Sequence, residues 1–147
     1  MNNNSMLEIS DNLFNLMIQF HNKLMNPNEM TKRVSIPPSH MKVIFYLSRK
    51  KFMSVSDVAK CLDISKPNMT PIIDKLISEG YVYRYTNPDD RRKLNIELTE
   101  KAYEFLKERE NAMKSILLEK ISSLDDENLN KLNSLVKDLN EIIVSLK

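Results

Sequence analysis

The chain has 147 residues and a net charge of +2, with 41% hydrophobic and 29% charged residues, as in a folded protein of one compact domain, with or without a helical extension. This size argues against a multi-domain enzyme, and one cysteine with two histidines builds neither an internal disulfide nor a familiar zinc site, so we expect no cofactor. Because no apolar stretch nears the roughly 20 residues of a membrane helix and no signal peptide is visible, we expect a cytoplasmic protein without membrane contact.

The first predicted element is an amphipathic helix over residues 6–25. Apolar residues recur along it at spacings of four, three and four, which places them on one helix face. They are Leu13, Met17, Phe20 and Leu24. The sequence Asn-Pro-Asn at residues 26–28 predicts the end of this helix.

Two shorter helices are predicted next. Consecutive prolines followed by Ser39 open a helix that we expect to end near residue 51, because proline is favoured in a first helical turn. Its expected buried positions are Met41, Ile44, Phe45 and Leu47. Residues 54–62 form the other, with Ser54 as N-cap and Asp57 in the first turn. Its expected inward positions are Val55, Val58, Ala59 and Leu62.

A fourth helix is predicted from Ser65, as N-cap, to residues 79–80. Gly80 is the only glycine of the chain, and a helix end commonly needs one residue in the left-handed conformation that glycine adopts freely. Apolar residues at helical spacing are expected in the core, which leaves the polar set exposed. The apolar residues are Met69, Ile72, Ile73, Leu76 and Ile77.

A β-hairpin is predicted over residues 81–98. Two runs rich in aromatic, β-branched or alternating apolar residues flank Asn-Pro-Asp-Asp, which is typical of a turn. Arg91, Arg92 and Lys93 place three cations at or beside the tip. Taken alone, such a tip favours a solvated surface turn, and contact with a polyanion is the alternative.

Two helices are predicted after the hairpin. Thr99 is expected to cap a long one over residues 100–121, and residues 123–125 begin the last. Apolar residues of the last helix alternate spacings of three and four, as in a coiled-coil seam. They are Leu129, Leu132, Val136, Leu139, Ile143 and Leu146. The seam can pack within the chain or across a dimer, and the amount of apolar helical surface at the termini favours a dimer.

The charge is concentrated in the middle of the chain. Residues 31–101 contain 14 Lys and Arg against 8 Asp and Glu, a charge of +6, so a total of +2 leaves −4 for the remainder. Helix, tight turn, helix and basic hairpin in this order make a winged helix-turn-helix, so the predicted fold class is mainly α with a small β-hairpin wing (α+β). A basic centre of this kind favours duplex DNA as partner.

Candidate DNA-contacting residues follow from this geometry. A major groove admits one α-helix, whose first turns face the base edges. Asn68 can pair with an adenine edge, Thr70 can offer a methyl or hydroxyl, and Lys66 can contact guanine or phosphate. The exposed set early on the fourth helix is Ser65, Lys66, Pro67, Asn68, Thr70 and Pro71, and Lys75 lies farther along for phosphate. On the hairpin the candidates are Asp90, Arg91, Arg92 and Lys93.

Two segments carry a family resemblance. Asp-Ile-Ser-Lys-Pro-Asn-Met-Thr-Pro-Ile-Ile-Asp-Lys-Leu-Ile-Ser-Glu-Gly-Tyr-Val at residues 63–82 and Asn-Pro-Asp-Asp-Arg-Arg-Lys-Leu-Asn-Ile-Glu-Leu-Thr at 87–99 resemble the MarR family of bacterial transcriptional regulators. The most specific part is an aspartate, one residue, an arginine and a strand ending Leu-Thr, here Asp90, Arg92 and residues 98–99. The similarity covers nearly the whole chain.

The resemblance implies an organisation and a function. Residues 1–30 form an N-terminal dimerisation helix, 31–100 the winged DNA-binding lobe, and 101–147 the C-terminal dimerisation helices. Recognition helices enter successive major grooves of double-stranded DNA, while Arg92, oriented by Asp90, enters a flanking minor groove. We therefore predict a sequence-specific transcriptional regulator, a ligand-responsive repressor acting as a homodimer on a pseudo-palindromic operator. Its effector is expected to be a small aromatic or phenolic molecule.

Two departures from the family pattern and several alternatives stay open. Pro71 deletes a helical N–H and can bend the recognition helix, and Ala102 stands where glycine often occurs. No nucleophile with a base and no glycine-rich phosphate loop is visible, so we expect no enzyme. A winged helix can also bind RNA or serve as a protein-interaction module without DNA specificity. Cys61 can sense oxidants, although its place near Val58 favours a small core residue.

Overall fold

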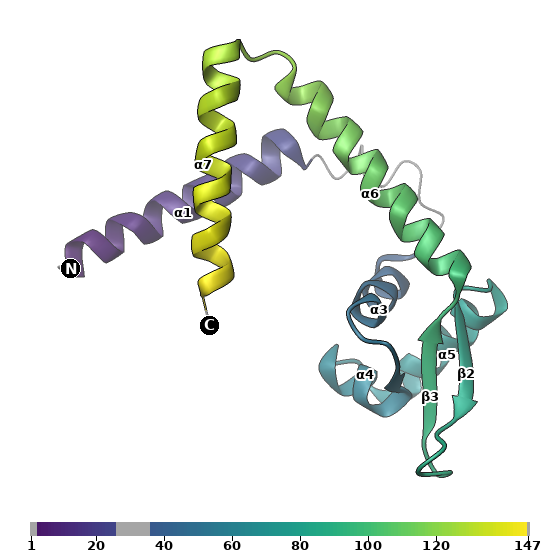
Figure 1. The fold of residues 1–147 in the computed structure, drawn as a ribbon. Coiled ribbons are helices and arrows are strands. Elements are labelled where there is room, and N and C mark those ends of the chain that lie inside the picture. Colours follow the sequence, from purple (N-terminus) through teal and green to yellow (C-terminus); the bar gives the residue numbers. More distant parts are fainter. Residues whose placement is uncertain (1–2, 26–35, 147) are drawn as a thin grey trace. The chain divides into compact units, whose positions relative to one another are not determined.

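The computed structural model describes residues 3–25 and 36–146, and Figure 1 shows how the elements of this part follow one another. They are α1 (Asn3–Leu24), α3 (Pro38–Ser48), β1 (Met53–Ser54), α4 (Val55–Cys61), α5 (Lys66–Ser78), β2 (Val82–Thr86), β3 (Leu94–Leu98), α6 (Glu100–Ile121) and α7 (Asp126–Ser145). The predicted fold class is confirmed, because the described chain is mainly helical with a small antiparallel sheet.

The chain divides into two compact units. Met30–Asn111 is called the lobe below, and Met1–Glu29 with Ala112–Lys147 is called the terminal unit. The boundary crosses α6, so this helix contributes to both. The expected helix end at residues 26–28 lies outside the described residues.

The lobe encloses one apolar core, to which α3, α4, α5, β2, β3 and the first turn of α6 contribute. Its buried members are Ile36, Val43, Ile44, Leu47, Val58, Ala59, Met69, Ile73, Leu76, Val82, Ile96, Leu98 and Ala102. The inward face predicted for the fourth helix is confirmed, because Met69, Ile73 and Leu76 are buried while Ile72 and Ile77 are half-buried. The other helices and the sheet pack against these buried residues of α5. This packing determines which face of α5 is exposed to solvent.

The sheet has three strands in the order β1-β3-β2, all antiparallel in the part of the chain that the structure describes. The hairpin of β2 and β3 was predicted, and its register pairs Val82 with Leu98 and Thr86 with Leu94. β1 was not predicted; its Met53 and Ser54 pair with Ile96 and Asn95 of β3. β3 is therefore the central strand, with a neighbour on each side.

The helix α3 differs from its prediction in two respects. It ends at Ser48 rather than near residue 51, and Phe45 is 50% exposed instead of buried. Ile44 and Leu47 are buried as predicted, and Val43 completes the buried face in place of Phe45. Because each residue turns a helix by about 100°, Phe45 lies on the side opposite the centre of that face.

The turn between α4 and α5 is closed by backbone geometry. Ser54 caps α4 as predicted, since its Oγ accepts a hydrogen bond from the Asp57 N–H at 3.1 Å. At the other end Asp63 has a φ of 52°, and Ile64 N–H donates to Ala59 O at 2.9 Å. This is a Schellman-type helix end with an aspartate in the left-handed position, a conformation that aspartate tolerates better than most residues.

α5 ends in the same way at the predicted place. Gly80 has a φ of 79°, and Tyr81 N–H donates to Leu76 O at 2.9 Å. Thr99, the predicted cap of α6, accepts from Ala102 N–H at 3.3 Å and donates its hydroxyl to Gly80 O at 2.6 Å. Lys101 Nζ adds a bond to Glu79 O at 2.6 Å. The first turn of α6 thus satisfies carbonyls at the end of α5, so the two helices are tied together.

The terminal unit consists of α1, α7 and the distal part of α6. Asp125 caps α7 by accepting from Asn128 N–H at 2.8 Å, which confirms the predicted start of the last helix. Neither α1 nor α7 contains a buried residue within its described length, although both carry many large apolar side chains. No helix among the described residues has the length and apolarity that crossing a bilayer requires.

Candidate nucleic-acid interface

The first two turns of α5 present the residues that the sequence singled out. Ser65, Lys66, Pro67, Asn68, Thr70 and Pro71 are all exposed. Met69, in the middle of them, is fully buried and fixes which face of the helix is turned inward. The structure therefore gathers these six on one accessible surface at the helix N-terminus, where backbone N–H groups also favour anions.

Hydrogen bonding within α5 determines which groups of Ser65 and Thr70 are free to bind a ligand. Ser65 occupies the N-cap position, but among the described residues its hydroxyl makes no capping bond, so that hydroxyl is available to a ligand. The Thr70 hydroxyl donates to Lys66 O at 3.2 Å. Thr70 consequently presents its methyl group and oxygen lone pairs rather than a free proton. Pro71 lies inside α5, which nevertheless continues to Ser78.

The second half of α5 is locally charge-balanced. Lys75 Nζ lies 3.2 Å from a Glu79 carboxylate oxygen, one helical turn away. Asp74 receives the guanidinium of Arg84, on β2, at 3.2 Å. The second pair joins α5 to the hairpin, although at a solvent-exposed site such a pair contributes little to stability.

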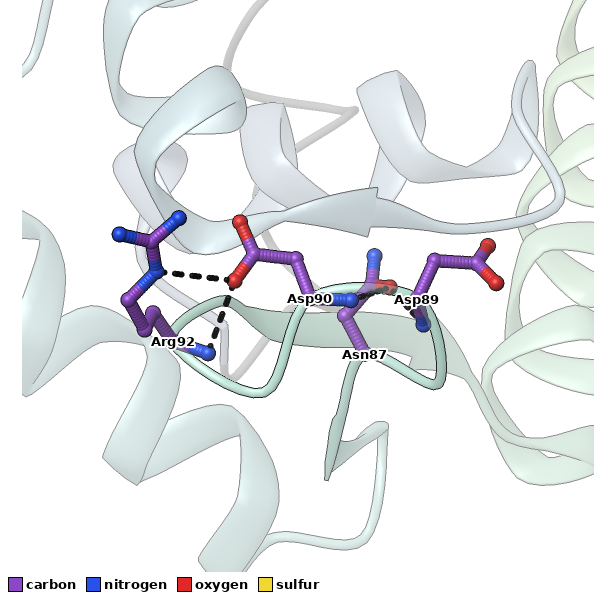
Figure 2. Close-up of polar contacts among 4 residues, drawn as sticks. All are labelled: Asn87, Asp89, Asp90 and Arg92. Atoms are coloured by element: carbon purple, nitrogen blue, oxygen red, sulfur yellow. Dashed lines mark hydrogen bonds and ion pairs between the residues drawn. The ribbon is translucent and has the colours of Figure 1, made fainter.

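The hairpin tip is held by side chains of its own residues, as Figure 2 shows. Asn87 Oδ1 accepts from the N–H groups of Asp89 and Asp90, at 2.8 and 3.0 Å. Asp90 Oδ1 in turn accepts from the Arg92 backbone N–H at 3.1 Å and from its Nε at 3.2 Å. The Arg92 side chain is 92% exposed, and its bond to the carboxylate is made through Nε. The expected contact between Asp90 and Arg92 is present, and Arg91 and Lys93 beside it are exposed.

The sequence of the lobe matches a known protein family. A model of the MarR family matches residues 36–94, which run from the first described residue of the lobe to the first residue of β3. These residues form a MarR-family domain.

Transcriptional repressor MprA from Escherichia coli strain K12 is 33% identical over 99 residues, which are 65% of this chain. The chain spans only 56% of the length of MprA.

Solved structures share the fold over most of the chain. Transcriptional regulator Tm0710 from Thermotoga maritima has a TM-score of 0.77 at 17% identity, covering 93% of this chain and 94% of that one. A MepR variant from S. aureus, bound to an oligodeoxyribonucleotide, has a TM-score of 0.68 at 19% identity, covering 94% and 98%. At such identities the likeness shows the fold.

Two asparagines of the lobe escaped the sequence reasoning. Asn95 alternates with Leu94 and Ile96 on the central strand β3, yet it is 2% exposed. Asn87 Nδ2 donates to Asn95 Oδ1 at 3.3 Å, whereas Asn95 Nδ2 finds no hydrogen-bond acceptor among the described residues. The available signal was an asparagine at the first turn position, where its side chain commonly bonds the backbone two residues on.

The outer face of the hairpin carries two tyrosines beside one carboxylate. The rings of Tyr83 and Tyr85 stack with centroids 5.8 Å apart, and Tyr85 donates to Glu97 Oε2 at 3.3 Å. Hydrogen bonding with Glu97 also raises the pKa of the Tyr83 hydroxyl, with partial burial a smaller cause. The Tyr83 hydroxyl therefore stays protonated at neutral pH.

Cys61 is exposed, so its interpretation as a core residue is wrong. It is the last residue of α4, and the helix turns Val58 and Ala59 inward instead. Hydrogen bonding with Cys61 raises the pKa of the Tyr46 hydroxyl. Across residues 3–25 and 36–146, no three His, Cys, Asp or Glu side chains gather as a metal site needs.

Proposed function

We propose that this chain is a sequence-specific, double-stranded-DNA-binding transcriptional repressor without enzymatic activity. The observation that carries the proposal is the pairing of an exposed recognition-helix N-terminus with an exposed arginine at the hairpin tip, in one MarR-family domain. The name of MprA as a transcriptional repressor and the oligodeoxyribonucleotide bound by the MepR variant support this function. A cytoplasmic location belongs to the proposal, since the protein acts where DNA is accessible.

In this proposal the two parts of the lobe contact DNA differently. Asn68 reads an adenine edge in the major groove, and Thr70 packs its methyl group against a thymine methyl. Ser65 and Lys66 bind phosphate or guanine, Lys75 binds phosphate once it exchanges Glu79 for DNA, and Pro67 and Pro71 add apolar contact. Arg92 enters a narrow minor groove, whose negative potential attracts a guanidinium, while Arg91 and Lys93 contact phosphates.

We further propose that the protein acts as a homodimer held by the helices of the terminal unit. Support comes from the large apolar side chains that α1 and α7 leave exposed in the single chain, among them Phe14, Met17, Val136 and Ile143. An apolar surface of this extent on two long helices is typical of an interface rather than of a solvated face. A dimer with two-fold symmetry then predicts a pseudo-palindromic operator with half-sites roughly 34 Å apart.

The proposed repressor responds to a small aromatic or phenolic effector. Such a molecule releases DNA only if it binds the DNA-incompetent arrangement of the dimer more tightly than the competent one. No side chain in the described chain identifies the effector, so this part rests on the family resemblance alone.

A selection experiment tests the DNA-binding function. Duplexes are selected from a random library on the immobilised protein, and the affinity for the selected duplex is compared with a scrambled one at rising salt concentration. We expect the selected duplex to be bound at least about 10³-fold more tightly, with an affinity that falls steeply with salt. Equal affinity for both duplexes, or no enrichment at all, would overturn the proposal in favour of a protein-interaction module.

A redox response through Cys61 is a second proposal, favoured by the exposure of its thiol. Peroxide would oxidise the thiolate to a sulfenic acid and release hydroxide. We expect DNA binding to fall after peroxide treatment in the wild-type protein and to persist in Cys61→Ser. An equal response of the two proteins would exclude this mode of control.

A further inference from the structure

Asn87 uses both ends of its side-chain amide, although it lies in a surface hairpin. Its Oδ1 accepts from the N–H groups of Asp89 and Asp90 within the loop (Figure 2). Its Nδ2 donates in the opposite direction, to Asn95 Oδ1 at 3.3 Å. One half-buried side chain thus connects the loop to the sheet.

The residue at the other end of this connection is a fixed point. Asn95 is 2% exposed on the central strand β3, where it pairs with Ser54 of β1 and with Tyr85 of β2. Burying an amide whose Nδ2 has no hydrogen-bond acceptor among the described residues costs the folded protein free energy. An apolar side chain of similar size at the same place would avoid this cost. The hydrogen bond that Asn95 Oδ1 accepts from Asn87 Nδ2 is the interaction for which a polar side chain is needed at this buried position.

The connection continues to the exposed arginine. Backbone bonds from Asn87 N–H to Lys93 O and from Lys93 N–H to Asp90 O, each 2.9 Å, close the loop. The second of these bonds holds the carbonyl side of Asp90, whereas Asn87 Oδ1 holds its N–H and the Arg92 N–H binds its carboxylate. That carboxylate in turn holds Arg92, a side chain too exposed for packing to orient.

We propose that Asn87 is a positioning residue that sets the direction of Arg92 through Asp90, with Asn95 as its anchor in the sheet. This inference rests on the proposed function, because it gives Arg92 a DNA target. An arginine held in one direction before binding loses less conformational freedom on entering a groove. Asn87→Ala should therefore weaken binding only as far as Arg92 contributes to it.

A double-mutant cycle with Asn87→Ala and Arg92→Ala tests this dependence on the selected duplex. Asn87→Ala alone should raise Kd roughly 5- to 10-fold, and less than about 2-fold when Arg92 is already alanine. Asn87→Ser, which keeps an acceptor for the turn N–H groups, should recover most of the affinity. Thr86→Ala, at a neighbouring exposed position, is the matched control and should leave Kd unchanged.

A second measurement needs no DNA. Amide hydrogen exchange should speed up at Asp89 and Asp90 in Asn87→Ala, and return toward the wild-type rate in Asn87→Ser. Unchanged exchange at Asp90, or losses of Arg92→Ala and Asn87→Ala that simply add, would overturn the positioning role while the DNA-binding function stands. If Arg92→Ala itself leaves Kd unchanged, the wing assignment of the proposed function fails instead. Should Asn87→Ala not fold, the same cycle is run with Asn95→Ala, which removes the acceptor of the Asn87 Nδ2 bond.

Discussion

Arg92 is the single side chain on which the proposed wing contact depends most. It is 92% exposed and bonded within the chain to Asp90, so its removal takes away no core packing. We expect Arg92→Ala to weaken operator binding about 10-fold or more, at unchanged thermal stability, because a guanidinium leaves a narrow groove of high negative potential. Fluorescence anisotropy with a labelled duplex measures the loss.

Arg91→Ala is the matched control for Arg92, since it removes an equal charge from the adjacent exposed residue. A phosphate contact of this kind should cost less and should weaken specific and random DNA alike. Equal losses for the two variants would make Arg92 one more surface cation rather than a groove probe.

Asn68 is expected to affect discrimination more than affinity for DNA in general. Its exposed amide lies in the first turns of α5, and a bidentate pair with adenine discriminates between bases by about 1–3 kcal/mol. Asn68→Ala should therefore lower the ratio of specific to random binding about 10-fold. Lys75→Ala, the comparison variant, should lower both affinities together and reduce the salt slope by about one. A fall in both affinities for Asn68→Ala would identify it as a phosphate contact.

At single positions, sequence reasoning was reliable for exposure on α5 and less so elsewhere. The helical spacing of Met69, Ile73 and Leu76 predicted the buried face because one helix turns only one stripe to one core. The burial of Asn95 and the exposure of Leu94 do not follow from alternation along β3, because which face of the sheet is covered depends on the elements packed against it. Phe45 and Cys61 were misjudged because in short helices a single turn cannot separate inward from outward apolar residues.

Among the elements, the two helix ends with left-handed residues offer an opposite pair of substitutions. Asp63 carries a side chain at a φ of 52°, and Gly80 carries none at 79°. We expect Asp63→Gly to raise the free energy of unfolding by about 0.5–1 kcal/mol and Gly80→Ala to lower it by about 1 kcal/mol, since only glycine adopts this region without steric cost. Urea denaturation followed by circular dichroism measures both. A destabilised Asp63→Gly would mean that the aspartate side chain does more than end α4.

The ends of helices were predictable where the sequence contains a capping residue. Thr99 starts α6 and Gly80 ends α5 as expected, because a cap residue acts on its own local backbone. β1 was missed because two residues carry no periodicity, and this strand exists only through pairing with β3, more than 40 residues later in the chain. Nonlocal pairing of this kind cannot be read from local composition.

For the whole molecule, the seam of α7 makes the proposed dimer testable. Val136 is 53% exposed in the single chain and lies in the middle of the seam. We expect Val136→Glu to convert a dimer into a monomer of 17.2 kDa, because the carboxylate would be buried without a partner at the interface. Light scattering during gel filtration measures the mass.

Lys137→Gln changes the neighbouring exposed position and should leave the dimer intact. A wild-type protein that is monomeric at micromolar concentration would overturn the dimer proposal outright. The sequence pointed to an interface through the amount of apolar helical surface, but it could not say which faces meet. That choice depends on shape complementarity between two copies, which no periodicity encodes.

The strand order also has a consequence for handling the protein. β2 is an edge strand of the sheet, so in the described chain its outward N–H and C=O groups have no neighbouring strand to pair with. Its sequence Val-Tyr-Arg-Tyr-Thr has a high β propensity, and Arg84 is its only charge. A charged residue on an edge strand hinders edge-to-edge pairing with the sheet of another copy, which is a route to aggregation. Arg84, anchored to Asp74, is therefore the residue on which resistance to aggregation during concentration and storage should depend.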